Sequence, residues 1–318
     1  MKTPSLASTP YELLQRILSY IHPRDIQKYK LLCQRIRTCL VDPHTAFLNI
    51  KQFIPINQPS TATPYAPELK ILWFSWPPVY QQVYASRFNS KLVRFTFSRQ
   101  IHRPIPKAIS LLSSLICLDI SYSDINGSIP SEIGFLMSLE TLDLRLNDLT
   151  GEIPSTIGNL SKLRKLNLNG NRLTGPIPES LGNLINLEYL ILSRNRLSST
   201  IPSTLGTLKS LVELDLERNK LLGPIPSSLT TLPLLQFLYL SNNNLSGEIP
   251  ESIGDLTSLE ELFLKSNEFV GGIPGTIGRL ENLAELNVLH NDYLDKKIPK
   301  EVIKESRIYN LLIRNGFE

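Results

Sequence analysis

Leucines recur in the pattern LxxLxL, and the pattern returns with a step of 24 residues over much of the chain. One unit reads LETLDLRLNDLTGEIPSTIGNLSK, residues 139–162. Alternate side chains of a strand face opposite sides, so Leu142 and Leu144 would point inward and Thr141, Asp143 and Arg145 outward. The pattern therefore predicts one short strand in each unit, with one face in a core.

Two further positions keep the same step. Ile-Pro pairs fall every 24 residues from 129–130 to 273–274, and an eighth pair follows at 298–299. An asparagine follows each strand, where the chain must turn, and Ser123 takes that place in the first unit. The asparagine amide both donates and accepts, so it can satisfy backbone groups that a turn leaves without partners. We therefore predict a structural ladder of Asn147, Asn171, Asn195, Asn219, Asn243, Asn267 and Asn291.

These features resemble the plant-type leucine-rich repeat, with its LxGxIP segment, over eight units in residues 115–299. The resemblance implies an α/β fold, a right-handed solenoid with a concave parallel sheet. A single unit cannot bury its apolar stripe alone, so stability would come from stacked neighbours. Residues 69–114 read as degenerate repeats forming an N-terminal cap, and residues 300–318 as a C-terminal cap. The Pro-, Ser- and Thr-rich residues 51–68 read as a linker.

A small all-helical segment, residues 1–50, is predicted ahead of the solenoid. Thr9-Pro10-Tyr11-Glu12 forms a capping box, apolar residues follow at helical spacing, and Pro23 separates two helices. The segment resembles an F-box at Pro10, Glu12-Leu13-Leu14, Ile17-Leu18, Pro23, Asp25-Ile26, Cys33, Arg35 and Asp42-Pro43, although Thr9 and Ile36 depart from that pattern.

The F-box resemblance implies docking to the adaptor of a cullin-RING ubiquitin ligase. The adaptor-binding residues would be Pro10, Leu13, Leu14, Ile17, Leu18, Pro23 and Ile26. In the alternative interpretation these helices only cap the first repeat, and their leucines belong to the core.

Stacked units would align their outward strand residues in rows on the concave face. Large apolar and acidic side chains gather in the middle of these rows: Tyr189, Ile191, Glu213, Asp215, Phe237, Tyr239 and Phe263. Aromatic anchors beside charge are typical of protein-binding hot spots. We predict that this face binds a protein or peptide ligand; the alternative is a scatter of surface hydrophobics, which are common.

Composition and charge narrow the function. The net charge of +4 indicates neither a nucleic-acid nor a membrane partner. The four histidines are isolated, and no zinc spacing, nucleophile elbow or phosphate loop is present, so we expect no metal, no cofactor and no enzyme activity. The three cysteines do not form a disulfide framework, and no signal-peptide or membrane-spanning run is found. These observations predict a cytoplasmic or nuclear location.

Together the patterns predict an intracellular interaction module whose concave face recruits a partner, as the substrate receptor of a cullin-RING ligase. Two alternatives remain open. One is a stand-alone repeat scaffold without adaptor binding. The other is a secreted or receptor-type repeat protein that binds a ligand or inhibits an enzyme, and glycosylation at Asn244, a formal acceptor, would favour it.

Overall fold

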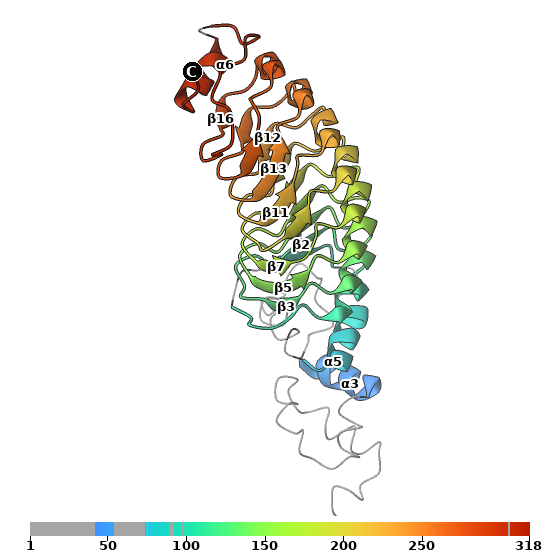
Figure 1. Ribbon diagram of the computed structural model, residues 1–318. Helices are drawn as coiled ribbons and strands as arrows, with labels where there is room; N and C mark the ends of the chain where they lie inside the picture. The colour runs from blue at the N-terminus through green and yellow to red at the C-terminus, as the bar shows by residue number, and fades with distance from the viewer. Residues whose placement is uncertain are drawn as a thin grey trace, which may run out of the picture.

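The computed structural model describes residues 42–53, 74, 76–88, 92–96, 98, 100–304 and 306–318. These residues form a curved stack of coils, with helices α3 (Pro43–Phe53) and α5 (Pro78–Val83) at one end and helix α6 (Arg307–Arg314) at the other (Figure 1). A π-helical turn, η3 (Tyr84–Phe88), follows α5 directly. The stack confirms the predicted leucine-rich repeat solenoid.

The main sheet follows the LxxLxL pattern. In the described part of the chain it has nine parallel strands, and each pairs with the strand of the next unit. From β2 onward, each strand residue pairs with the equivalent residue 24 positions later, as in Leu142↔Leu166 and Leu214↔Leu238. The strands are β1 (Arg94–Thr96), β2 (Cys117–Asp119), β4 (Thr141–Asp143), β6 (Lys165–Asn167), β8 (Tyr189–Ile191), β10 (Glu213–Asp215), β12 (Phe237–Tyr239), β14 (Glu261–Phe263) and β16 (Glu285–Asn287). The predicted parallel sheet is thereby confirmed.

A second set of short strands, which the sequence did not predict, forms at the turn after each asparagine. It has two groups: β3 (Asn126–Ser128), β5 (Asp148–Glu152) and β7 (Arg172–Thr174), then β9 (Ser198–Thr200), β11 (Lys220–Gly223), β13 (Asn244–Glu248) and β15 (Glu268–Val270). The groups separate beside Ser199, which has a φ of 72° where neighbouring units place Gly175 and Gly223. A left-handed serine is disfavoured there because its Cβ crowds the backbone.

Short 3₁₀ helices return the chain along the outer side of the curve (Figure 1). They are η4 (Lys107–Leu111), η5 (Ser131–Phe135), η6 (Ser155–Asn159), η7 (Glu179–Asn183), η8 (Ser203–Thr207), η9 (Ser227–Thr231), η10 (Glu251–Asp255) and η11 (Gly275–Arg279). Glycine allows them to stack closely, since a Cβ on Gly206 would lie 2.4 Å from the carbonyl oxygen of Ser228. Thr230 takes this position in η9, where its hydroxyl donates to Ser227 O at 2.7 Å.

The core is a continuous column of the repeated apolar positions. Leu142, Leu144, Ile157 and Leu160 are fully buried, and their counterparts in the other units are buried in the same way. Burying such a side chain contributes about 1.5–3 kcal/mol, so the column supplies the main stabilisation. Each unit completes the column of its neighbour, which positions the strands at constant spacing.

Asparagine side chains bridge successive units behind the main sheet. The Asn219 amide nitrogen donates to Leu192 O and Leu216 O, both at 3.1 Å, and its oxygen accepts from Leu197 N at 3.0 Å. The same three kinds of bond occur along the ladder, at Asn147, Asn171, Asn195, Asn243, Asn267 and Asn291. All seven side chains are buried, so their polar groups depend on these partners.

Candidate ligand-binding face

Seven side chains lie together on four adjacent strands of the main sheet, β8, β10, β12 and β14. The register places Glu213 between Tyr189 and Phe237, and it places Asp215 between Ile191 and Tyr239. Phe263 follows Tyr239 on the neighbouring strand. We call these seven residues the central patch: Tyr189, Ile191, Glu213, Asp215, Phe237, Tyr239 and Phe263. The structure therefore brings together every residue that the sequence predicted for partner binding.

Three aromatic side chains of the central patch, Phe237, Tyr239 and Phe263, pack against one another. The rings of Phe237 and Tyr239 are stacked with centroids 6.3 Å apart, and those of Tyr239 and Phe263 meet edge to face at 5.3 Å. Tyr239 donates its hydroxyl hydrogen bond to Glu261 Oε2 at 2.7 Å. Tyr189 is exposed, while the other apolar members are half-buried. The patch thus has a fixed apolar surface with solvent access.

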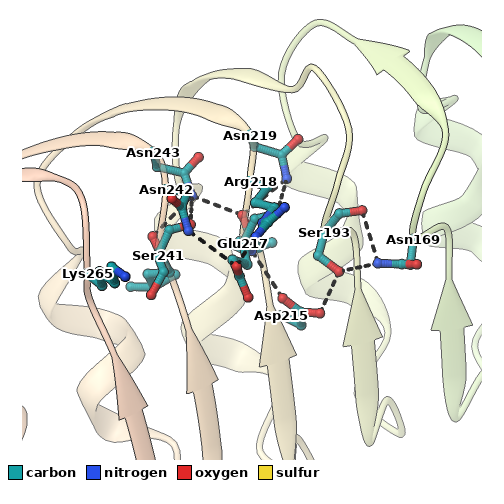
Figure 2. A network of polar contacts seen from close by, with 12 residues as sticks. Asn169, Ser193, Asp215, Glu217, Arg218, Asn219, Ser241, Asn242, Asn243 and Lys265 are labelled. Carbon is teal, nitrogen blue, oxygen red and sulfur yellow. Dashed lines mark hydrogen bonds and ion pairs between the residues drawn. The ribbon is translucent and has the colours of Figure 1, made fainter. Parts of the chain in front are cut away.

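Asp215 is held by donors that carry no charge. Asn169 donates to Ser193 Oγ at 2.6 Å, Ser193 donates to Asp215 Oδ2 at 2.5 Å, and the backbone N–H of Glu217 donates to Asp215 Oδ1 at 3.0 Å. Figure 2 shows this line of side chains above the ends of the strands. Burial raises the pKa of Asp215, while the bonds from Ser193 and Glu217 oppose that rise; the charge of Glu217 adds to the rise and the charge of Arg194 opposes it. The carboxylate is thus oriented by neutral donors, and Arg194 acts on it only from beyond ion-pair distance.

Glu213 lies beside Asp215 in the neighbouring row. Burial raises the pKa of Glu213, the charge of Asp215 raises it further, and the more distant Lys165 opposes both effects. Glu261 adds to the rise from the other side. Glu213, Asp215 and Glu261 therefore share one half-buried region among aromatic rings, and the charges of Asp215 and Glu261 make the charged form of Glu213 less favourable.

The N-terminal part of the same face is different. Asp143 occupies the row of Asp215, and its Oδ1 accepts from Arg145 N at 3.2 Å as Asp215 accepts from Glu217 N. However, Arg145 Nε and Lys165 Nζ lie 3.7 and 4.0 Å from Asp143 Oδ2. The carboxylate of Asp143 thus has two cations within ion-pair distance, which Glu213 and Asp215 lack among the described residues.

Glu261 and Ser193 belong to this site, although the sequence analysis did not select them. Glu261 accepts from the central tyrosine, and Ser193 orients Asp215. The 24-residue step placed both in the outward rows, but only the side-chain conformations of the structure show which neighbours they contact. Glu217, between Arg218 Nε at 3.2 Å and Asn242 Nδ2 at 3.3 Å, continues the polar border seen in Figure 2.

The predicted adaptor-binding residues Pro10, Leu13, Leu14, Ile17, Leu18, Pro23 and Ile26 lie outside the described residues. Within the described part, no group of three or more His, Cys, Asp or Glu side chains could hold a metal ion. Cys117 is a free thiol on β2 whose pKa is raised by burial. No described helix combines the length and the apolar character needed to cross a bilayer.

A family model of the leucine-rich repeat region matches residues 99–221 and 176–312. These two matches overlap and together extend over more than half of the chain. The chain therefore belongs to the leucine-rich repeat family. A search of curated proteins finds no match.

Several solved plant structures are similar to the chain. The leucine-rich repeat ectodomain of the membrane receptor kinase GASSHO1/SCHENGEN3 from Arabidopsis thaliana, in complex with CASPARIAN STRIP INTEGRITY FACTOR 2, is 41% identical with a TM-score of 0.61, over 62% of this chain and 24% of that one. The Arabidopsis receptor kinase HAESA, in complex with the peptide hormone IDA and the co-receptor SERK1, is 40% identical with a TM-score of 0.59, over 62% and 33%. A plant ice-binding protein is 29% identical with a TM-score of 0.51, over 59% and 69%.

This chain spans about a quarter to a third of the two receptor chains. Their location overturns the predicted cytoplasmic or nuclear compartment, because the similar repeats are ectodomains of plant membrane receptors. The prediction rested on cysteine spacing and on the first residues of the sequence, and neither is a property of the repeats themselves. The repeats match an extracellular class, and nothing in these matches supports the F-box resemblance.

Proposed function

We propose that the concave face binds an extended peptide, or an exposed segment of a protein, as a receptor-type ligand-binding module outside the cell. The central patch carries this proposal. Phe237, Tyr239 and Phe263 form one packed group on the open sheet rather than a scatter of single hydrophobic side chains, and acidic residues lie beside this group.

The main sheet explains why side chains would do the binding. Each inner strand already pairs with a neighbour on both sides, so its backbone groups are satisfied. Clustered aromatic residues offer large contact area at low cost in conformational entropy, which is why they are enriched at binding hot spots. A partner that follows the row direction would contact β8, β10, β12 and β14 in turn.

The similar receptors support this class of function. The structure of one of them holds the peptide hormone IDA, and another holds CASPARIAN STRIP INTEGRITY FACTOR 2. These relationships favour receptor-type ligand binding over substrate recruitment for a ubiquitin ligase. The bound ligands are those of the similar receptors. For this chain, we infer the ligand from the residues of its own concave face.

Selection from a random peptide library displayed on phage tests the proposal. We expect the wild-type chain to select peptides that the double variant Tyr239→Ala, Phe263→Ala no longer retains. Phe135→Ala is the matched control, because Phe135 is an exposed aromatic residue of η5 on the outer side. If no selected peptide distinguishes the double variant from the wild type and the control, the central patch is not the binding site and the proposal fails.

A further inference from the structure

We infer that the ligand inserts a lysine or arginine side chain between the carboxylates of β10 and the aromatic residues of β8 and β12. This inference rests on the proposed function and specifies its ligand as a basic peptide. The cation would meet Glu213 and Asp215, with Tyr189, Phe237 and Tyr239 on either side.

The charge of these carboxylates is the first argument. Among the described residues, no lysine, arginine or histidine lies within ion-pair distance of Glu213 or Asp215, whereas Asp143 in the row of Asp215 has both Arg145 and Lys165. The pKa of Glu213 is raised by burial and then by Asp215, and the pKa of Asp215 is raised by burial. Lys165 and Arg194 oppose these rises, but neither forms an ion pair with the two carboxylates. A cation from a partner would relieve both effects, since an opposite charge nearby favours the ionised form.

Preorganisation is the second argument. Both oxygens of Asp215 have neutral donors, Ser193 Oγ at 2.5 Å and Glu217 N at 3.0 Å, and Ser193 is fixed in turn by Asn169. Figure 2 shows these neutral donors around the carboxylate. A carboxylate fixed in this way loses little conformational freedom on binding, so more of its attraction to an incoming cation contributes to the binding free energy.

The surroundings of the carboxylates are the third argument. Tyr189 and Ile191 border them on β8, and Phe237 and Tyr239 border them on β12. Lysine and arginine carry an apolar stem beneath a charged head, and aromatic rings attract the head while they cover the stem. Acidic groups inside an aromatic frame fit such a side chain better than they fit a purely apolar or an acidic one.

The peptides selected on the wild-type chain provide the test. We expect a lysine or arginine at one shared position, and replacing it by alanine should weaken binding about tenfold or more. The double variant Glu213→Gln, Asp215→Asn should weaken the same peptides by a similar factor and should not respond to the peptide substitution. Asp143→Asn is the matched control and should bind like the wild type.

Two outcomes separate the possible failures. Peptides that require Tyr239 and Phe263 but carry no shared basic residue, or that bind the double variant unchanged, overturn this inference and leave the proposed function intact. Selected peptides that do not depend on the aromatic residues overturn the proposed function and this inference with it. Glu213→Gln alone controls for misfolding, because no described side chain forms a hydrogen bond or ion pair with Glu213, and this single variant should retain the wild-type unfolding midpoint or exceed it while binding more weakly.

Discussion

Asn315 of the C-terminal helix pairs with Val288 at the edge of the main sheet. The side-chain oxygen of Asn315 accepts from Val288 N at 2.9 Å, and its nitrogen donates to Leu286 O at 2.8 Å. In the preceding unit, Leu264 N donates to the backbone carbonyl of Asn287 at 2.7 Å. The side chain of Asn315 therefore replaces the peptide group of a further strand and closes an edge that would otherwise be open to another chain.

Replacing this residue should weaken the last repeats. Asn315→Ala leaves Val288 N and Leu286 O buried without partners, which costs about 1–3 kcal/mol. We expect faster amide hydrogen exchange in β16 and a lower unfolding midpoint. Asn183→Ala, an exposed residue of η7, should leave both unchanged. Equal exchange in Asn315→Ala and the wild type would show that α6 does not protect the edge.

The inner ladder should respond in a similar way. Asn219→Ala removes bonds to two units at once, because Leu192 O, Leu216 O and Leu197 N all lose their side-chain partner. We expect a loss of about 1–3 kcal/mol in the free energy of unfolding, measured by chemical denaturation. Asn183→Ala again provides the control. A loss no greater than that of the control would mean that the ladder adds nothing to stability.

The sequence predicted this ladder and the parallel sheet because both follow from positions that repeat every 24 residues. The rows of the concave face, including Tyr239 beside Phe263, follow from the same step. The pairing of Asn315 could not be predicted, because it joins a helix outside the repeat to β16 and has no counterpart at any repeat interval. The contact of Tyr239 with Glu261 likewise depends on side-chain rotamers, which periodicity does not specify.

Gly206 of the 3₁₀ helix η8 and Gly272, which lies outside the 3₁₀ helices, provide two contrasting glycine substitutions. Gly206→Ala would place a Cβ 2.4 Å from Ser228 O in the next unit, so the units must separate locally. We expect this to lower stability by about 1–3 kcal/mol, as overpacking usually does. Gly272→Ala meets no atom within 4 Å and should leave the unfolding midpoint unchanged or slightly raised. Equal midpoints for the two variants would contradict the close-stacking role of Gly206.

Ser199 is the one residue of the LxGxIP glycine row, between Gly127 and Gly271, that is not glycine, and it has a φ of 72°. Ser199→Gly should relieve the left-handed strain of about 1–2 kcal/mol, while the greater freedom of glycine in the unfolded chain offsets part of this gain. We expect a net increase of up to about 1 kcal/mol in the free energy of unfolding. A decrease would indicate that Ser199 makes a compensating interaction in the folded chain.

The acidic pair of the central patch should make stability depend on pH. Burial and the charges of Asp215 and Glu261 raise the pKa of Glu213 above its unfolded value, although the charge of Lys165 opposes the rise. The folded state therefore binds this proton more tightly, and the corresponding stabilisation is lost as pH rises through the raised pKa. Glu213→Gln removes the penalty, so we expect this variant to be more stable than the wild type at pH 7 and similar to it near pH 4.

Glu132 provides a control of opposite sign for the pH dependence. The backbone hydrogen bond at Glu132, together with Lys107 Nζ at 3.1 Å, lowers the pKa of that carboxylate. Its contribution is therefore present at neutral pH and is lost as pH falls through the lowered pKa. Glu132→Gln should be slightly less stable than the wild type at pH 7, with no difference in strong acid. If Glu213→Gln also lost stability at pH 7, the carboxylate of Glu213 would have a compensating partner in the wild type. The inference that the central patch carries uncompensated negative charge would then be wrong.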